Sequence, residues 1–515
     1  MTAVTQTPAP AGTSSPPRLL RALGPLTAMA VVVGTVIGSG VFKKPHEVAE
    51  QIPFFGLVAI AWILGGVLTL LGSFAIAEVA VLFPRAGGNY VFLREGFGRL
   101  FGFLWGWVEF LIIKGASLAA LASVFSESVH DVLNNSALRR AVGLEPTSVG
   151  LSLWQQHLVA VAVIGILTFV NVIGVRWSGR LQLGITLIKV GSLLGILILP
   201  FAVLLLARPG PDGMLPSVHN LAPIWPAWSA FDVGRFGAAL VGVLWAYDGW
   251  INIAPVAEEV RQPQRNIPIG LLGGIGVIVF LYLGANLAYA LVLPVETLQG
   301  ATHSIVATVF SERLLGPIGV AVASAAIMVS VFGALNGLLL AGPRVLYAMG
   351  EDGLVPPSLG AVHPRFRTPA LSIVVMGLWA ALLVLAGAAL TMYRLPALNL
   401  GGWSLDINVP AGKSLFDVLT DFDIFGVVFF QTLGVVSIFI FRRRMPNAER
   451  PYRCWGYPWT PALHVLGMAL VAVNMFFHQR TETIMGLSFI AVGVPAYYLA
   501  RWRWSRAPSP HVSPR

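Results

Sequence analysis

Hydrophobic residues dominate this chain in long runs that short polar stretches separate. A run of about 20 apolar residues is long enough to cross the hydrocarbon core of a bilayer as a helix. Twelve runs of this kind occur, at residues 24–50, 55–83, 96–127, 157–175, 181–207, 235–258, 268–293, 315–349, 370–391, 416–441, 460–478 and 483–501. The pattern predicts an all-α polytopic membrane protein with twelve transmembrane helices.

The first run is interrupted near its middle by small residues. Gly34, Gly38, Ser39 and Gly40 lie within seven positions, and each glycine inside a helix is less favourable than alanine by about 1 kcal/mol. Small residues at this spacing also allow close helix packing in membranes. The first run alone therefore leaves two interpretations open, a packing surface and a broken helix that lines a site.

The sixth run repeats this pattern. Asp248 and Gly249 stand in its middle, and Pro255 follows. An aspartate at this depth requires a partner or a polar cavity. The first and sixth runs each begin a group of five, and interrupted helices at matching places in two halves indicate a binding site between inverted repeats. The paired pattern thus favours a site where freed N–H groups bind an anion and freed carbonyls bind a cation.

The same pattern predicts the division of the chain. We expect two inverted five-helix repeats, an outer loop between them, two additional C-terminal spans, and tails at both ends, of which the Pro/Ser/Thr-rich first one is disordered. The predicted boundaries are 1–20 for the N-terminal tail, 21–207 for the first repeat, 208–234 for the outer loop, 235–441 for the second repeat, 442–501 for the additional spans and 502–515 for the C-terminal tail. The outer insertion at 394–415 has no functional interpretation from its sequence.

Composition and charge agree with a membrane protein. The chain is 56% hydrophobic and 11% charged, whereas charged residues make up about 25% of a typical soluble domain. Of the 33 lysines and arginines, 21 fall in loops on one predicted side and eight in the opposite loops. By the positive-inside rule both termini are cytoplasmic. The net charge of +10 is therefore explained by topology, and we predict no nucleic-acid partner.

The chain lacks the sequence patterns of common catalytic centres. Its single cysteine, Cys454, excludes an internal disulfide and a zinc site built on several thiolates. A P-loop, a nucleophile elbow and a clustered His/Asp/Glu set are all absent. We therefore predict no enzyme activity, no metal and no cofactor.

Ionisable residues within the runs are candidates for function because their burial in a membrane is unfavourable. Lys189 stands near the middle of the fifth run, and Lys114 follows Glu109 by five positions in the third, a spacing that does not assure a shared helix face. Glu78 and Arg85 lie two helical turns apart and are candidates for a cytoplasmic gate, or for a surface charge pair at a plain loop.

Several ordered motifs resemble the amino acid–polyamine–organocation superfamily, and most of all its bacterial L-amino-acid-transporter-type exchangers. The resemblance covers roughly residues 20–500. It is carried by GTVIGSGVF at 34–42, AEVAVLFPRAGGNYVFLREGFG at 77–98, WAYDGW at 245–250, AEEVRQPQRNIPIG at 257–270, SVFGALNGLLLAGPRVLYAMGEDGLVP at 330–356 and RRRMPNAERPYRCWGYP at 442–458.

The resemblance implies alternating access and specific roles for residues near the two breaks. An amino acid carboxylate should meet backbone N–H groups at Ser39 and Gly40, and its ammonium should meet carbonyls near Ile37, Trp245 and Asp248. Gly34, Gly38, Gly40 and Gly249 should form the helix breaks, and Trp245 should close the site toward the outside. Ser330 should contribute to the substrate site, with Asn336 near it.

The resemblance also bears on coupling and partners. Lys189 matches a lysine of sodium-independent members whose ammonium takes the place of a sodium ion, and Lys114 stands where bacterial relatives often have arginine. The animal exchangers join a glycoprotein through an outer-loop cysteine, and the loop at 128–156 has none. We therefore expect no disulfide-linked ancillary subunit, and membrane lipid and an L-amino acid as the molecules that the protein meets.

The leading hypothesis is a multi-pass permease of the cytoplasmic membrane that exchanges neutral L-amino acids without sodium. The alternative is a proton-coupled importer of cationic amino acids, polyamines or other amines. A substrate sensor that has lost transport is a further hypothesis, against which the intact breaks and Lys189 argue.

Overall fold

The computed structural model describes residues 19–135, 139–140, 150–206, 210–211, 213, 215–227, 229, 231–300, 305–392, 398–400, 403–405 and 415–504. Within them, twelve helical stretches are long and apolar enough to cross a membrane. The first six spans are α1 (Pro25–Val36) with α2 (Gly40–Gln51); α3 (Phe55–Leu82); α5 (Arg99–Val108), the π-helix η1 (Glu109–Lys114) and α6 (Gly115–Asn134); α8 (Leu153–Ile173); α9 (Val175–Leu205); and α10 (Val233–Tyr247) with η4 (Trp250–Ile253).

The other six spans follow in sequence order. They are α11 (Pro263–Pro268), η6 (Ile269–Gly273) and α12 (Gly274–Val292); α15 (Pro317–Ala341) with α16 (Pro343–Glu351); α17 (Ala370–Met392); α18 (Leu415–Arg444); α19 (Trp459–His478); and α20 (Arg480–Trp504). Short helices lie between spans, namely α4 (Asn89–Phe97), η2 (Val218–Leu221), η5 (Ala257–Glu259), α13 (Val295–Gln299), α14 (Val306–Leu315) and η7 (Pro357–Gly360).

The predicted all-α architecture with twelve spans is confirmed, and most boundaries agree to within a few residues. The largest shifts are at the end of span 3, which was predicted at residue 127 and lies at Asn134, and at the start of span 5, which was predicted at residue 181 and lies at Val175. Gly174, with φ 154°, separates it from span 4, and the polar residues after this glycine continue the helix beyond the apolar run. The division into two inverted repeats stays a prediction.

Spans 1 and 6 are interrupted where the glycine patterns predicted. Three residues, Ile37–Ser39, separate α1 from α2, while α10 ends at Tyr247 and only a 3₁₀ turn follows the break. Both interrupted spans are interior, since 78% of the apolar window of span 1 and 67% of that of span 6 are buried, against 28% for spans 4, 5 and 12. This burial places the broken segments away from lipid, as an open backbone requires.

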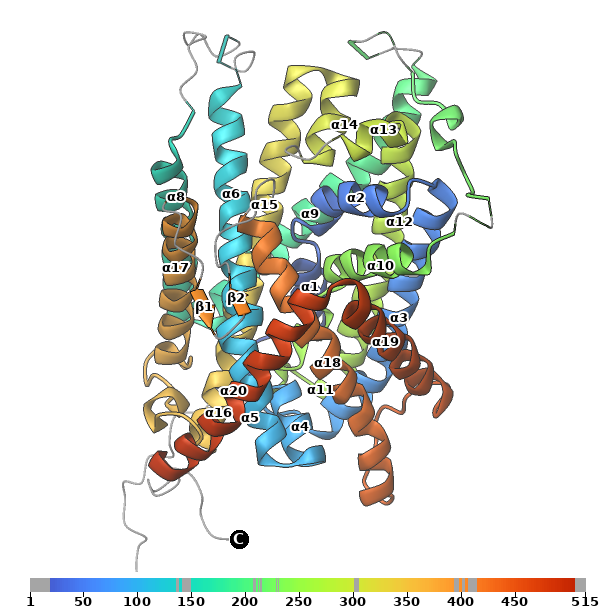
Figure 1. Cartoon of the computed structure of the whole chain (residues 1–515). Helices are drawn as coiled ribbons and strands as arrows, with labels where there is room; N and C mark the ends of the chain where they lie inside the picture. Colours follow the sequence, from blue (N-terminus) through green and yellow to red (C-terminus); the bar gives the residue numbers. More distant parts are fainter. Residues whose placement is uncertain are drawn as a thin grey trace, which may run out of the picture.

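The other helices surround these two broken spans. Figure 1 shows α1 and α10 within the bundle, with α8 and α17 along one side and α3 and α19 along the other. α1 packs against α9, α12 and α15, and α10 packs against α2, α3 and α19. The two breaks are therefore enclosed by spans from both halves of the chain.

A small antiparallel hairpin adds β-structure to the helical bundle. β1 (Leu398–Leu400) pairs with β2 (Trp403–Leu405), with Leu398 opposite Leu405 and Leu400 opposite Trp403. The hairpin belongs to the insertion at 394–415, of which residues 394–397, 401–402 and 406–414 lie outside the described part of the chain. Of the tails predicted at 1–20 and 502–515, residues 1–18 and 505–515 also lie outside it.

Candidate functional site

The carbonyl groups at the break in span 1 receive donors from other spans. Lys189, on α9, donates hydrogen bonds to the carbonyl oxygens of Gly34 at 2.7 Å and Ile37 at 2.6 Å. The Ser330 hydroxyl, on α15, lies 3.1 and 3.0 Å from the carbonyl oxygens of Ile37 and Gly38. Lys189 and Ser330 are both fully buried. The carbonyl side of the break is thus satisfied by spans 5 and 8.

The break in span 6 lies directly beside the break in span 1. Gly249 follows the end of α10 with φ 101°, a left-handed conformation that favours glycine. The Tyr282 hydroxyl, on α12, is 2.9 Å from the carbonyl oxygen of Val36 and 3.1 Å from that of Ala246. The Thr35 hydroxyl lies 2.9 Å from the carbonyl oxygen of Gly249. These contacts join the two broken segments.

The amide side of the break in span 1 is left open. Among the described residues, nothing accepts a hydrogen bond from the N–H groups of Ser39, Gly40 and Val41 at the start of α2. The Ser39 hydroxyl is likewise without a partner there, although Ser39 is only 1% exposed. Free N–H groups at a helix N-terminus favour an anion, and the helix dipole adds to this preference. The arrangement therefore provides donors for a small anionic group.

We predict that Gly40→Ala reduces activity by about tenfold or more, whereas Gly38→Ala stays within about twofold, because misplacement of a substrate-positioning segment is known to have effects of this size. A Cβ atom at Gly40 would lie 2.8 Å from Cα of Ala246, whereas one at Gly38 would meet Leu121 at 3.4 Å, an ordinary contact. Uptake of radiolabelled L-amino acid into proteoliposomes that contain either purified variant measures the difference. Equal uptake would show that the close approach of α2 to α10 is unimportant.

Asp248 and Trp245 extend the site along span 6. The Asp248 carboxylate accepts a hydrogen bond from Gln431 of α18, at 2.7 Å. The ring of Trp245 lies against the Gly40 position, and the Lys44 ammonium is 5.2 Å from the ring centroid. Lys44 also forms an ion pair with Glu47, at 2.6 Å. The predicted residues that meet around the two breaks are Gly34, Ile37, Gly38, Ser39, Gly40, Trp245, Asp248, Gly249 and Ser330.

Asn336 lies in a polar network between spans 4, 5 and 8. It donates a hydrogen bond to Gln182 at 2.7 Å and accepts one from Asn171 at 3.0 Å. The Ser178 hydroxyl is 3.2 Å from the same Asn336 oxygen. All four side chains are buried. The network was missed at the sequence level, because single polar residues on three separate runs show no common pattern.

Lys114 meets Glu109 because span 3 changes its helical geometry there. The segment Glu109–Lys114 is a π-helix, in which residues five apart are brought into register. The Lys114 ammonium is 3.6 Å from the Glu109 carboxylate, and both side chains are buried. A regular α-helix would have turned them to different faces, so the sequence spacing alone left this pair undecided.

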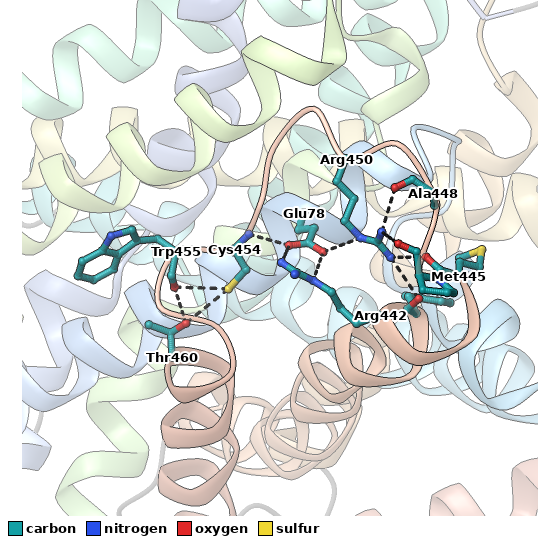
Figure 2. Close-up of polar contacts among 10 residues, drawn as sticks. Glu78, Arg442, Met445, Ala448, Arg450, Cys454, Trp455 and Thr460 are labelled. Atoms are coloured by element: carbon teal, nitrogen blue, oxygen red, sulfur yellow. Dashed lines mark hydrogen bonds and ion pairs between the residues drawn. The ribbon is translucent and has the colours of Figure 1, made fainter.

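Glu78 is the centre of an ion cluster that joins span 2 to the end of span 10 and to the segment that follows it (Figure 2). Its carboxylate accepts two hydrogen bonds from Arg442, at 2.8 and 2.6 Å, and one from Arg450, at 3.1 Å. The backbone N–H of Cys454 donates a further one, at 2.6 Å. Figure 2 shows both guanidinium groups converging on this one carboxylate. Glu78 therefore has arginine partners from more than 360 positions away in the sequence.

The predicted pairing of Glu78 with Arg85 is not formed. α3 ends at Leu82, and Pro84 then turns the chain, so that Arg85 is exposed beyond the helix end. The seven-residue spacing would place the two side chains on one face only if the helix continued. The role of Glu78 in a gate stays a prediction, but its partners are Arg442 and Arg450.

Cys454 is buried within this cluster, and burial raises the pKa of its thiol. A raised pKa means less thiolate at neutral pH, and thiolate is the reactive form. We predict that a maleimide labels native Cys454 roughly tenfold or more slowly than an exposed cysteine at the adjacent position, in the double variant R453C/C454A. Fluorescent labelling against time measures both rates. Equally fast labelling would contradict the buried placement.

A second buried ion pair joins α16 to the segment that follows span 6. Arg344 of α16 forms a two-pronged ion pair with Glu259 of η5, at 2.8 and 3.2 Å, and both side chains are fully buried. The carbonyl of Glu259 accepts hydrogen bonds from the N–H groups of Ala22 and Leu23, at 2.9 and 3.0 Å. The chain before α1 is thereby attached to the segment after span 6. This pair was missed at the sequence level, although Glu259 lies in one of the motifs quoted above.

Comparison with known proteins adds family relationships to this geometry. The family described as amino acid permease matches residues 23–496. The serine/threonine exchanger SteT of Bacillus subtilis (strain 168) is 31% identical over 485 residues, which cover 93% of this chain and 97% of that protein. The human cystine/glutamate transporter is 27% identical, and the match covers 98% of this chain and 91% of that protein. Large neutral amino acids transporter small subunit 2 of Rattus norvegicus is 28% identical, and the match covers 95% of this chain and 82% of that protein.

Proposed function

Since this chain belongs to the amino acid permease family, we propose that it moves neutral L-amino acids across the cytoplasmic membrane by alternating access. The transport is sodium-independent exchange, in which one amino acid enters as another leaves. The relatives support this proposal, because two of those named above are described as a serine/threonine exchanger and a large neutral amino acids transporter.

One observation carries the proposal, the open donors at the start of α2. The N–H groups of Ser39, Gly40 and Val41 and the Ser39 hydroxyl have no acceptor among the described residues and lie in the protein interior. Buried donors without acceptors are unfavourable, so a carboxylate that binds there supplies what they lack. Every L-amino acid carries this group.

The ammonium of the substrate is placed on span 6 rather than on span 1. The Ile37 carbonyl already has two donors, Lys189 and Ser330, which use both of its lone pairs. The backbone near Trp245 and Asp248 lies beside the start of α2, because Gly40 packs on Ala246. We therefore assign the ammonium to the backbone carbonyls near Trp245 and Asp248, with the Trp245 ring covering the site.

Lys189 supports transport without sodium. Its ammonium binds two carbonyl oxygens at the break in span 1, and backbone carbonyls at such breaks are the groups that coordinate sodium in other transporters. The Lys189 side chain occupies these carbonyls as a hydrogen-bond donor and removes the need for a bound sodium ion. Lys114 and Glu109 form a further buried ion pair within span 3.

Topology and partners follow from the same proposal. Both termini are cytoplasmic, and the end of the bundle with Arg344, Arg442 and Arg450 faces the cytoplasm. The protein acts without a disulfide-linked subunit, because its single cysteine, Cys454, is buried next to Glu78. The two halves that begin with spans 1 and 6 are inverted repeats.

Uptake of radiolabelled L-alanine and L-serine into proteoliposomes tests the proposed function. The vesicles are either empty or preloaded with unlabelled amino acid, each with and without an inward proton gradient, and protein-free vesicles are the control. We expect uptake that requires the preload, ignores the gradient and does not change when sodium replaces potassium.

Other results would redirect the proposal. Uptake into empty vesicles that a proton gradient drives would favour the proton-coupled alternative, and competition by L-lysine or a polyamine would identify a cationic substrate. Binding of amino acids, seen as a thermal shift, without any flux would indicate a sensor.

A further inference from the structure

A small cavity lies between spans 2, 6, 10 and 11. Its polar lining consists of Thr69 of α3, Asp248, Gln431 of α18 and His464 of α19. Apolar residues, among them Leu244 and Met468, complete the wall. Within the cavity, the space that the centres of water molecules can occupy is about 20 Å³. A cavity of roughly 10–15 Å³ is enough to hold one water, so this cavity can be hydrated.

His464 presents an unsatisfied atom in the protein interior. Its Nδ1 is 2.8 Å from the carbonyl oxygen of Leu68, and because a carbonyl only accepts, Nδ1 must carry the hydrogen. In the neutral ring Nε2 is then an acceptor. Nε2 is buried and has no partner among the described residues, and His464 as a whole is 2% exposed. Gly72 allows this placement, since a Cβ there would lie 2.6 Å from Cε1 of the ring.

The neighbouring polar groups that the structure describes do not bond Nε2 directly. The Thr69 hydroxyl donates to the carbonyl of Gly65 at 2.8 Å, and the Gln431 amide donates to Oδ1 of Asp248 at 2.7 Å. Asp248 as a carboxylate is acceptor-only, and its Oδ2 receives no hydrogen bond from the described residues. Two acceptors therefore border one cavity, and a molecule with two donor hydrogens would satisfy both.

We propose that one ordered water occupies this cavity and donates one hydrogen bond to Nε2 of His464 and one to the carboxylate of Asp248. His464 is then a positioning residue. Through the water it holds the Asp248 side chain toward spans 10 and 11, and so it orients the segment that follows the break in span 6. The effect on transport rests on the proposed function, whereas the presence of the water does not.

Charged groups around the cavity are consistent with a neutral water rather than an ion. Asp248 contributes the one charge of the lining, and the nearby Glu109 is paired with Lys114 at 3.6 Å. Thr69, Gln431 and His464 add no second carboxylate. A metal ion would require more oxygen ligands than this lining supplies.

High-resolution cryo-electron microscopy of the full chain in lipid nanodiscs tests the site directly. We expect a density peak within hydrogen-bonding distance of both His464 Nε2 and an Asp248 oxygen. An empty cavity, or a direct contact between the His464 ring and the Asp248 carboxylate, would overturn the proposal. This readout is independent of whether the protein transports amino acids.

Two substitutions at position 464 test the positioning role. His464→Gln keeps a donor for Leu68 and an acceptor for the water, whereas His464→Phe fills similar space with neither. We expect His464→Phe to raise KM for L-serine about fivefold with the maximal rate within about twofold, the sign of weakened binding rather than slower turnover. His464→Gln should restore KM to near the wild-type value. His478→Phe, at the exposed end of the same helix, is the control.

The outcomes separate the two proposals. A wild-type KM in His464→Phe, or equal defects in the Gln and Phe variants, would overturn the positioning role. If the wild-type protein transports no amino acid in any condition, the proposed function fails while the density still decides the water. Melting temperatures of all variants distinguish a KM effect from misfolding.

Discussion

Replacing Lys189 with alanine is expected to abolish transport while the protein still folds. The ammonium of Lys189 is the donor for the carbonyls of Gly34 and Ile37. Its loss leaves the buried carbonyl of Gly34 without its side-chain donor and that of Ile37 with Ser330 alone, at about 1–3 kcal/mol for a carbonyl that is left unsatisfied. A factor of ten in rate corresponds to about 1.4 kcal/mol, so we expect uptake below about one tenth of wild type if this penalty falls on the transport cycle.

The control for this variant is Arg180→Ala, an exposed cation on the same helix. It removes the same charge without touching the break, and we expect uptake close to wild type. Size-exclusion profiles of both variants check folding. Wild-type-like uptake by Lys189→Ala would show that the break in span 1 does not depend on this ammonium, and exchange without sodium would then need another explanation.

Breaking the pair of Arg344 with Glu259 is expected to cause the largest loss of stability. Removing one partner of a fully buried ion pair costs about 3–5 kcal/mol, because the other charge stays buried without compensation. Both side chains are 0% exposed, and Glu259 also bonds the chain before α1 through its carbonyl. We expect Arg344→Ala and Glu259→Ala each to lower the melting temperature clearly in a thermal unfolding assay.

A double variant and an exposed pair make this prediction specific. Arg344→Met with Glu259→Met removes both charges and keeps most of the volume, so it should be more stable than either single alanine variant. The matched control is Glu95→Ala, since Glu95 pairs with Arg94 at the surface and is 39% exposed. Pairs of that kind contribute at most about 1 kcal/mol. A double variant as unstable as the single ones would contradict the argument from unpaired charge.

Some placements in the bundle required long-range contacts that the sequence does not reveal. Glu78 illustrates this point, because its nearest cation in sequence, Arg85, lies beyond the end of α3, while Arg442 and Arg450 reach it from the far end of the chain. Asn336, predicted as a coupling or structural residue, bonds Asn171 and Gln182 on two other spans, and its role stays a prediction. Side chains at equal depth on different spans become neighbours only after the spans pack.

The local conformation of span 3 also depended on its surroundings. The sequence shows Glu109 and Lys114 five positions apart, and an α-helix would separate them around its axis. The π-helix brings them to 3.6 Å, and two charges buried in a membrane interior are stable only when they are paired. The preference for pairing belongs to the residues, but the turn geometry that permits it belongs to the packed helix.

The sequence by itself determined the twelve spans and the places of the two breaks. Spanning length and glycine content are local properties, and they act wherever a helix meets the bilayer. The folded chain decided which groups complete those breaks, since the donors to Ile37 and Val36 come from spans 5, 7 and 8. It also decided that the carbonyls are satisfied while the N–H groups of α2 stay open. Hydrogen bonds across hundreds of residues depend on distances that only tertiary packing sets.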